Sequence, residues 1–242
     1  PDEEILMYDH EDLIVAYTME KISNNLLLDE GPYNINGNIN GARKNSNGIV
    51  GSALSFDDKA DKVDLGNALT PILSANDAQF AISLWLKIDN DQGFVRILTK
   101  STPRDSGNNY RQLVLQTDAQ RNILFGWYGD NTGQVRRIAQ GPKLASGEWQ
   151  HLIISYNGRV SGNNGLDRVQ MYVNGSAVDT SFYSNTGLLS AIYNGGGSLT
   201  LGGEAGDTKV GSVGFSGLID QVRIFKRPIT AIEAVHLYSE GS

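Results

Sequence analysis

The residues best suited to contact a ligand lie in the segment Arg104–Arg137, which combines aromatic, amide and guanidinium side chains. Aromatic faces stack on the C–H groups of sugar rings, while amide, carboxylate and guanidinium groups hydrogen-bond to hydroxyl groups. This combination is typical of a carbohydrate-binding surface. The predicted ligand-binding residues are Tyr110, Gln112, Trp127, Tyr128, Arg136 and Arg137.

Strand alternation decides which of these side chains share a face. Successive side chains of a strand point to opposite faces. Tyr110, Gln112 and Gln116 therefore share one face, and Leu113 and Leu115 the other.

The neighbouring pairs Trp127-Tyr128 and Arg136-Arg137 must each split between the two faces. We expect an exposed aromatic and arginine patch centred on Trp127 or Tyr128. The alternative is that Trp127 belongs to the core, because aromatic residues on sandwich strands are more often buried than exposed.

Residue patterns for catalysis are missing from the sequence. The chain has no cysteine, and His10, His151 and His236 show no metal-binding spacing. A Gly-x-Ser-x-Gly nucleophile motif is also absent. We expect His151 to be a packed or hydrogen-bonded sheet residue, and we predict that the chain is not an enzyme.

Charge and hydropathy exclude two further classes of partner. The formal net charge is −7, and the longest basic run is Arg136-Arg137, so a nucleic-acid-binding function is not expected. No apolar run approaches the roughly 18–20 residues that a membrane span requires, so we expect no membrane span.

Short apolar runs separated by glycine and asparagine turns indicate many strands. The segment Phe80–Ile88 alternates strictly, Asn174-Gly175 is a hairpin-turn dipeptide, and Thr230 with Glu233 forms a capping box for a helix over Ala231–Leu237. The pattern favours a single domain over residues 1–242. Strands are expected at Leu13–Met19, Ala53–Phe56, Lys62–Leu65, Phe80–Ile88, Gly93–Lys100, Tyr110–Thr117, Asn122–Tyr128, Val135–Ala139, Trp149–Tyr156, Arg168–Val173, Ser198–Leu201 and Gly217–Phe225.

Several of these segments, in order, resemble one family. They are Leu13–Glu20, Gly48–Asp57, Phe80–Lys87, Gly147–Leu152, Val169–Gly175 and Phe215–Phe225 followed by Arg227–Thr230. Together they resemble the laminin-G-like (pentraxin-like) branch of the concanavalin A-like lectin/glucanase superfamily. The resemblance implies an all-β, two-sheet antiparallel jelly-roll β-sandwich with a short C-terminal helix.

The resemblance also implies functional residues. Members of the superfamily often bind one calcium ion that ties the first and last strands, which would place Glu20, the Gly41 carbonyl and Asp220 around a structural calcium. Glycosidases on this fold carry a Glu-x-Asp-x-x-Glu run, and this sequence has none. Trp85 and Trp149 match the pattern of the fold and are expected in the core, whereas Trp127 does not match it and is therefore favoured as the ligand-facing aromatic.

Three functions remain open. The first is a non-catalytic carbohydrate-binding or adhesion module of an exported bacterial protein, located outside the cell or at its surface, with a glycan or polysaccharide partner. The second is a protein-interaction or structural domain without a sugar site. The third is a divergent polysaccharide-degrading enzyme, which would need two acids within about 5–10 Å in a cleft.

Overall fold

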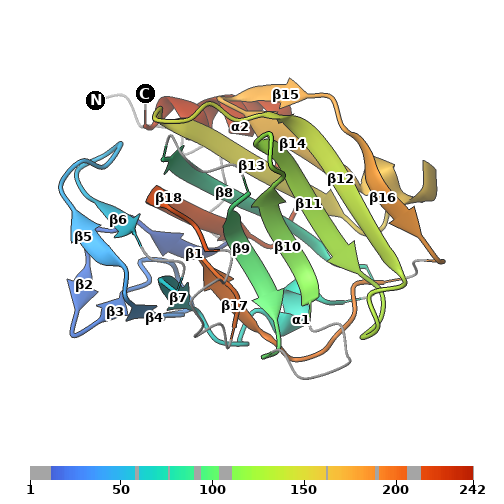
Figure 1. Ribbon diagram of the computed structural model, residues 1–242, viewed down its shortest axis with the longest axis horizontal. Helices are drawn as coiled ribbons and strands as arrows, with labels where there is room; N and C mark the ends of the chain where they lie inside the picture. Colours follow the sequence, from blue (N-terminus) through green and yellow to red (C-terminus); the bar gives the residue numbers. More distant parts are fainter. Residues whose placement is uncertain are drawn as a thin grey trace.

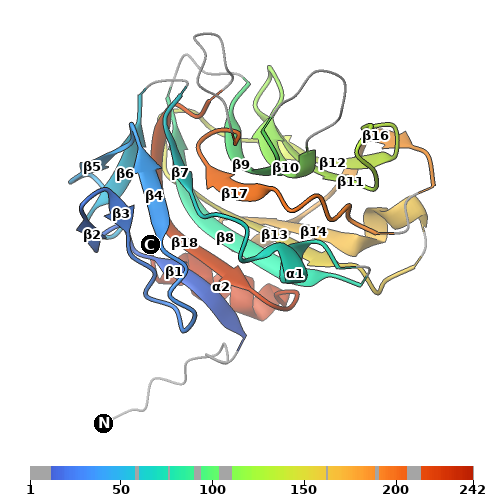
Figure 2. The same ribbon diagram turned by 90° about the horizontal axis from the view of Figure 1, so that it is seen from below.

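The computed structural model describes residues 12–57, 60–75, 77–89, 94–103, 111–161, 163–188, 191–205 and 214–241. These residues form two antiparallel sheets that face each other as two layers (Figures 1 and 2). The two-sheet sandwich predicted from the sequence is confirmed. The predicted strand Tyr110–Thr117 and the strand Gly93–Lys100 each begin outside the described residues, and Tyr110 itself is one of the undescribed positions.

The first sheet has eight strands. They are β1 (Leu13–Tyr17), β5 (Arg43–Asn45), β6 (Ala53–Phe56), β8 (Gln79–Ile88), β13 (Gln150–Asn157), β14 (Val169–Val173), β15 (Ser176–Val178) and β18 (Gly217–Phe225). Their order is β15-β14-β13-β8-β18-β6-β5, and β1 pairs with β18 beside β6. Strands distant in sequence therefore lie next to each other at the centre of this sheet.

The second sheet has ten strands. They are β2 (Ile22–Ser23), β3 (Leu26–Leu27), β4 (Gly37–Asn40), β7 (Lys62–Asp64), β9 (Arg96–Ser101), β10 (Arg111–Thr117), β11 (Asn122–Tyr128), β12 (Arg136–Lys143), β16 (Ser181–Thr186) and β17 (Ser198–Leu201). Their order is β16-β12-β11-β10-β9-β17-β7-β4-β3-β2. The segment Asn24–Asn47, rich in asparagine and glycine, contains three of the short strands in the two sheets, β3, β4 and β5.

The main core lies between the sheets. Alternation on β8 directs Phe80, Ile82 and Leu84 inward, and all three are fully buried. Opposite them, the ring of Phe125 meets Phe80 at a centroid distance of 6.5 Å, and Tyr156 stacks on Phe80 at 5.1 Å. Burial of each such side chain contributes roughly 1.5–3 kcal/mol to stability, so this layer dominates the folding energy.

The outer face of the eight-stranded sheet is covered by α2 (Ala231–Ser239), which lies along β1 and β18 in Figure 2. Thr230 caps the helix and forms the predicted capping box with Glu233. Arg227 forms ion pairs with Glu233 and with Asp12, at 2.5 and 2.6 Å. A second apolar cluster fills the space between helix and sheet: Leu13, Ala16, Ala81, Ile153, Tyr172, Phe225, Ile229, Ala234 and Leu237.

The described residues also contain α1 (Thr70–Leu73) and a 3₁₀ helix, η1 (Asn163–Arg168), which were not expected from the sequence. Among the described residues, no helix is long and apolar enough to cross a bilayer. The Asn174-Gly175 turn joins β14 to β15 with positive φ at both residues, 49° and 76°, as this dipeptide predicts.

Lys100 is an unusual component of the interior. It pairs in register with Leu113 and Leu199, which face the core, and it is only 1% exposed. Its ammonium group donates hydrogen bonds to Thr70 Oγ1 at 2.8 Å and to the Gly197 carbonyl at 2.5 Å. Burial lowers the pKa of Lys100 from 10.5 to about 8, because no charged group among the described residues offsets its loss of hydration.

This shift predicts a pH-dependent stability. Between pH 8 and 10.5 the unfolded chain binds a proton at Lys100 that the folded chain has released, so the free energy of unfolding increases as the pH rises through this window. We expect chemical denaturation to show this increase for the wild-type protein relative to Lys100→Met. Equal pH dependence in the two proteins would contradict the assignment.

Candidate functional site

The two neighbouring pairs of predicted ligand residues do split between the faces of the ten-stranded sheet, but Trp127 lies on the inner face. It pairs in register with Leu113, is fully buried, and stacks on Phe125 at a centroid distance of 5.7 Å. The prediction that Trp127 is the exposed aromatic is therefore wrong. The reason is packing: Trp127 shares the inward parity of Leu113 and Phe125, and it fills the end of the core beside Tyr156.

Tyr128 points to the outer face but is only 8% exposed. Its ring lies over Gly126, where a Cβ atom would come within 3.5 Å of the ring. Gln112, on the same face, is fully buried and accepts a hydrogen bond from the Gly197 N–H at 3.2 Å. These two residues support the sheet and do not form the open patch expected from the sequence.

The two arginines also take different roles. Arg137 is 3% exposed, and its guanidinium donates to the carbonyls of Thr186 and Gly187 at 2.8 and 2.9 Å. Burial, together with the charge of Arg168, lowers the pKa of Arg137 from its ordinary value. Arg136 lies opposite Tyr128 and is half-buried, donating to Ser184 Oγ and to the Gly133 carbonyl. Of the predicted set within the described residues, Arg136 has the largest share at the surface.

Trp85 and Trp149, expected in the core, also differ from each other. Trp85 is buried, but under α2 and outside the main core, where it stacks on Tyr238 at 5.4 Å. Trp149 is only half-buried. His151 is buried next to Trp85, and its Nε2 atom is 2.8 Å from Ser83 Oγ, as expected for a hydrogen-bonded sheet residue. Burial and the charge of Arg223 lower the pKa of His151 to about 3, so the ring is neutral at physiological pH.

The ten-stranded sheet contains an ion-pair cluster that the sequence analysis did not predict. Glu204 is 2% exposed and binds Arg96 at 2.7 Å and Arg111 at 2.6 Å. Two guanidinium groups compensate one buried carboxylate, which is the condition under which a buried charge is tolerated. The cluster fixes the turn after β17 against β9 and β10.

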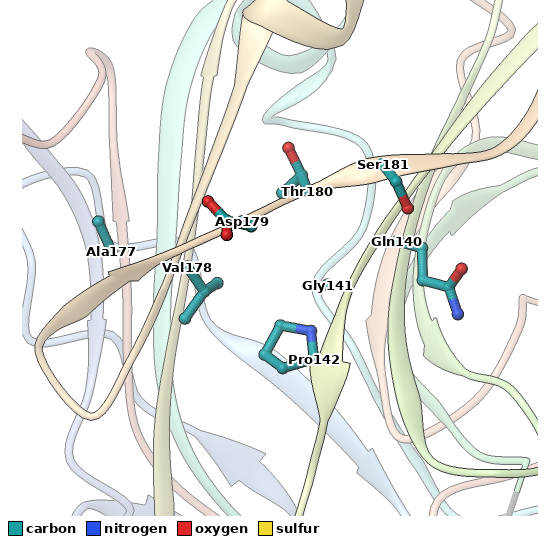
Figure 3. Close-up of a pocket in the computed structure, with 8 residues that line it drawn as sticks. All are labelled: Gln140, Gly141, Pro142, Ala177, Val178, Asp179, Thr180 and Ser181. Atoms are coloured by element: carbon teal, nitrogen blue, oxygen red, sulfur yellow. The ribbon is translucent and has the colours of Figure 1, made fainter.

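Among the described residues, a groove lies at one edge of the sandwich (Figure 3). Its volume is about 560 Å³. The lining residues come from the end of β12, from β15 and from the start of β16: Gln140, Gly141, Pro142, Ala177, Val178, Asp179, Thr180 and Ser181.

Strand geometry explains the groove. The pairing of β12 with β16 ends at Gln140 and Ser181, whereas β12 continues to Lys143 beside β11 alone. The chain crosses from the eight-stranded sheet to the ten-stranded sheet through Asp179 and Thr180, so the gap between the sheet edges stays open (Figure 3).

The groove presents polar groups that are not used internally. Within the described part of the chain, no hydrogen bond or ion pair involves the side chains of Gln140, Asp179, Thr180 or Ser181. Tyr183, two residues after Ser181 on β16, is 56% exposed. The groove therefore combines an amide, a carboxylate and two hydroxyl groups with an exposed aromatic residue on the strand that borders it.

Of the three residues predicted to bind calcium, Asp220 and Glu20 contact the segment 48–52, whereas Gly41 lies against Asp61. Asp220 is fully buried, and its carboxylate accepts hydrogen bonds from the N–H groups of Ile49, Val50 and Gln221. Burial raises the pKa of Asp220 to about 6, and the nearby Glu20 charge acts in the same direction.

Glu20 binds the same segment, residues 48–52, as Asp220 does. Its carboxylate accepts a hydrogen bond from the Ser52 N–H and pairs with Lys44 at 3.2 Å. Gly41 instead lies against the Asp61 carboxylate, which occupies the space a Cβ atom would need.

The fit to calcium is therefore partial. Both acids face the segment 48–52, but N–H donors and Lys44 occupy them, and no group of three or more carboxylate or imidazole side chains suited to a metal ion was found within the described residues. Calcium remains a prediction.

The fold and the sequence together define the class of protein. Residues 57–234 match the family described as the Concanavalin A-like lectin/glucanases superfamily, in its laminin-G group, and the chain belongs to this family. No curated protein sequence is significantly similar to the chain.

Solved structures show the same fold. Domain 4 of the extracellular arabinanase AbnA from Geobacillus stearothermophilus, in complex with arabinotriose, is 20% identical with a TM-score of 0.58; the match covers 94% of this chain and 98% of that domain. The receptor-binding domain of botulinum neurotoxin C/D mosaic serotype is 13% identical with a TM-score of 0.62, over 96% of this chain and 52% of that one.

A sialidase from Trypanosoma rangeli is also similar, with 13% identity and a TM-score of 0.64 over 94% of this chain. This chain spans about a third of the sialidase, 32%, and about half of the neurotoxin domain, 52%. At sequence identities of 13–20%, these comparisons show that the fold is shared and nothing beyond it.

The buried position of Trp127 predicts a large effect on stability. Trp127→Ala should lower the free energy of unfolding by about 3–5 kcal/mol, because it leaves a cavity between Phe125 and Tyr156. Tyr183→Ala, at an exposed position, should change it by no more than about 0.5 kcal/mol. Urea denaturation measures both. A loss below about 1 kcal/mol for Trp127→Ala would contradict the core assignment.

Proposed function

We propose that this domain is a non-catalytic carbohydrate-binding module of an exported bacterial protein, and that it binds its glycan in the groove between β12, β15 and β16. The observation that carries the proposal is the set of four polar side chains in the groove that have no hydrogen-bond partner among the described residues, beside an exposed tyrosine. Sugars require such groups, because every hydroxyl group both donates and accepts hydrogen bonds. The proposed site replaces the patch around Trp127.

The comparison with the arabinanase domain supports this proposal. That domain matches over nearly its whole length, is part of an extracellular enzyme, and was solved with an oligosaccharide. A domain of similar length and the same fold is therefore part of a glycan-processing enzyme. A role for this chain outside the cell or at its surface is part of the proposal.

The groove favours binding over hydrolysis. Glycosidases use two carboxyl groups about 5–9.5 Å apart, one as acid and one as base or nucleophile. Asp179 is the single acidic residue among those that line the groove. The side chains there can orient hydroxyl groups, but they do not supply the second carboxylate that bond cleavage requires.

A glycan and polysaccharide array that includes arabinotriose tests the function. We expect a specific signal for a neutral glycan. Asp179→Ala should then weaken binding about ten- to hundredfold, since a hydrogen bond to a charged group contributes about 1.5–3 kcal/mol. Tyr183→Ala should weaken it about three- to tenfold through loss of stacking.

Tyr33→Ala is the matched control, because Tyr33 is 54% exposed and lies between β3 and β4, strands at the opposite end of the ten-stranded sheet from β16. It should bind like the wild-type protein. A blank array with folded protein would favour the protein-interaction alternative, and turnover of a polysaccharide would favour the enzyme alternative.

We also propose a structural calcium ion near Glu20 and Asp220, on the resemblance to the family. Calcium chloride should then raise the melting temperature, because an ion that binds only the folded state stabilises it. The effect should fall as the pH drops through about 6, where Asp220 becomes protonated. Asp220→Asn keeps an acceptor oxygen for the N–H groups of Ile49 and Val50, and it should abolish the calcium-dependent rise in melting temperature. A melting temperature that is identical with calcium and with chelator would contradict the calcium site.

A further inference from the structure

A second, more enclosed pocket lies on the other side of the eight-stranded sheet from the core. It is bounded by β18, β8, the end of α2 and the segments that follow β1 and precede β6, and its volume is about 370 Å³. Small-molecule pockets have volumes of about 300–1,000 Å³. The lining residues are Thr18, Glu20, Glu30, Val50, Trp85, Gln221, Arg223, Leu237, Glu240 and Gly241.

Gln221 is a strained residue whose amide is aimed at this pocket. The register of β18 with β8 shifts between Asp220 and Arg223, and Gln221 in this bulge has a φ of 48°, which is unfavourable for a side chain of this size. The residue is 9% exposed and lines the pocket. Among the described residues, none forms a hydrogen bond with its side-chain amide.

The indole of Trp85 forms a second wall. Its ring packs against both His151 and Tyr238, with centroid distances of 5.1 and 5.4 Å, and those two rings are 6.2 Å apart, so the three rings fix one another's orientation. The backbone of Gly241 lies against the Nε1 edge, where a Cβ atom would be 2.6 Å from Nε1. Within the described part of the chain, the Nε1–H group has no hydrogen-bond acceptor, and Trp85 and Gly241 both line the pocket.

The acidic residues of the pocket are each compensated by a cation. Glu240 pairs with Arg223 at 2.7 Å, Glu30 with Lys21 at 2.7 Å, and Glu20 with Lys44 at 3.2 Å. Each of the three carboxylates that line the pocket therefore has one cationic partner. They do not converge as the carboxylates of a metal site do, since the described residues contain no such group. Away from the proposed calcium position at Glu20 and Asp220, the lining therefore suits a neutral ligand with several hydroxyl groups better than an organic cation.

We propose that this pocket binds a single neutral sugar unit, or a cyclic polyol of similar size, as a second site separate from the groove. The Gln221 amide donates to one hydroxyl group and accepts from another, Trp85 Nε1 donates to a ring or hydroxyl oxygen, and Glu240 accepts. This site rests on the proposed function, because it assigns a second glycan contact to the same module.

Nitrogen-15 NMR of the uniformly labelled protein tests the site directly. The chain has three tryptophans, so the indole region contains three signals, and single Trp→Phe variants at Trp149 and Trp85 assign them. Titration with D-glucose, D-galactose, D-mannose, L-arabinose and D-xylose should shift the Trp85 signal in a saturable way for at least one sugar. The Trp127 signal should not move, because that ring is buried in the core.

The variant Gln221→Gly distinguishes an effect on sugar binding from an effect on protein stability. Glycine adopts positive φ without strain, so the variant should be at least as stable as the wild-type protein. We expect its affinity for the sugar to fall at least tenfold. Asn25→Gly is the matched control, since Asn25 also has positive φ, 62°, but lies in the exposed turn between β2 and β3. Its affinity should be unchanged. Glu240→Gln provides a second variant and should weaken binding several-fold.

The outcomes distinguish the two sites. A saturable Trp85 shift that Gln221→Gly removes and Asp179→Ala leaves intact supports the pocket, whatever the array shows. No Trp85 shift with any of the five sugars, or an affinity that Gln221→Gly does not change, overturns it. An array signal that depends on Asp179 alone, with a silent Trp85, would leave the proposed function standing and remove the second site.

Discussion

Strand β18 must pair with β8 along one edge and with two different strands along the other, first β6 and then β1. Asp220 lies where β6 gives way to β1. Its buried carboxylate holds the segment before β6 through the N–H groups of Ile49 and Val50. This contact links residues about 170 positions apart, so β1, β6 and β18 can take their places only together. The helix α2 packs on the face that this pairing creates, and the capping box of Thr230 and Glu233 fixes where it begins.

The surface hollows follow from where strand pairing is imperfect. The groove exists because β12 extends past the end of β16. The pocket at Trp85 exists because β18 bulges at Gln221 and turns that side chain away from the core. In both places some polar side chains have no partner in the part of the chain that the structure describes, whereas elsewhere arginines such as Arg137 donate to loop carbonyls. The interior of the sandwich is filled by aromatic and aliphatic side chains, so binding is expected at its edges.

Local patterns predicted much of the fold and little of the site. The alternation of Phe80–Ile88, the turn at Asn174-Gly175 and the capping box are short-range signals, and each appears in the structure as expected. Alternation also established that Trp127 and Tyr128 lie on opposite faces, but it cannot say which face is the core, because that depends on how distant strands pair. The burial of Gln112 depends on a segment some eighty residues away. The groove depends on the unequal lengths of β12 and β16, and the positive φ of Gln221 depends on a bulge in β18. No residue pattern in the sequence predicts either feature.

The central claim is that this domain binds a glycan at the edge groove. The most direct measurement is a crystal structure of the protein with the oligosaccharide that gives the strongest array signal. The account predicts electron density for the glycan between β12 and β16, with hydroxyl groups hydrogen-bonded to Asp179 and Gln140. Density over the outer face beside Tyr128 and Arg136, with an empty groove, would contradict it.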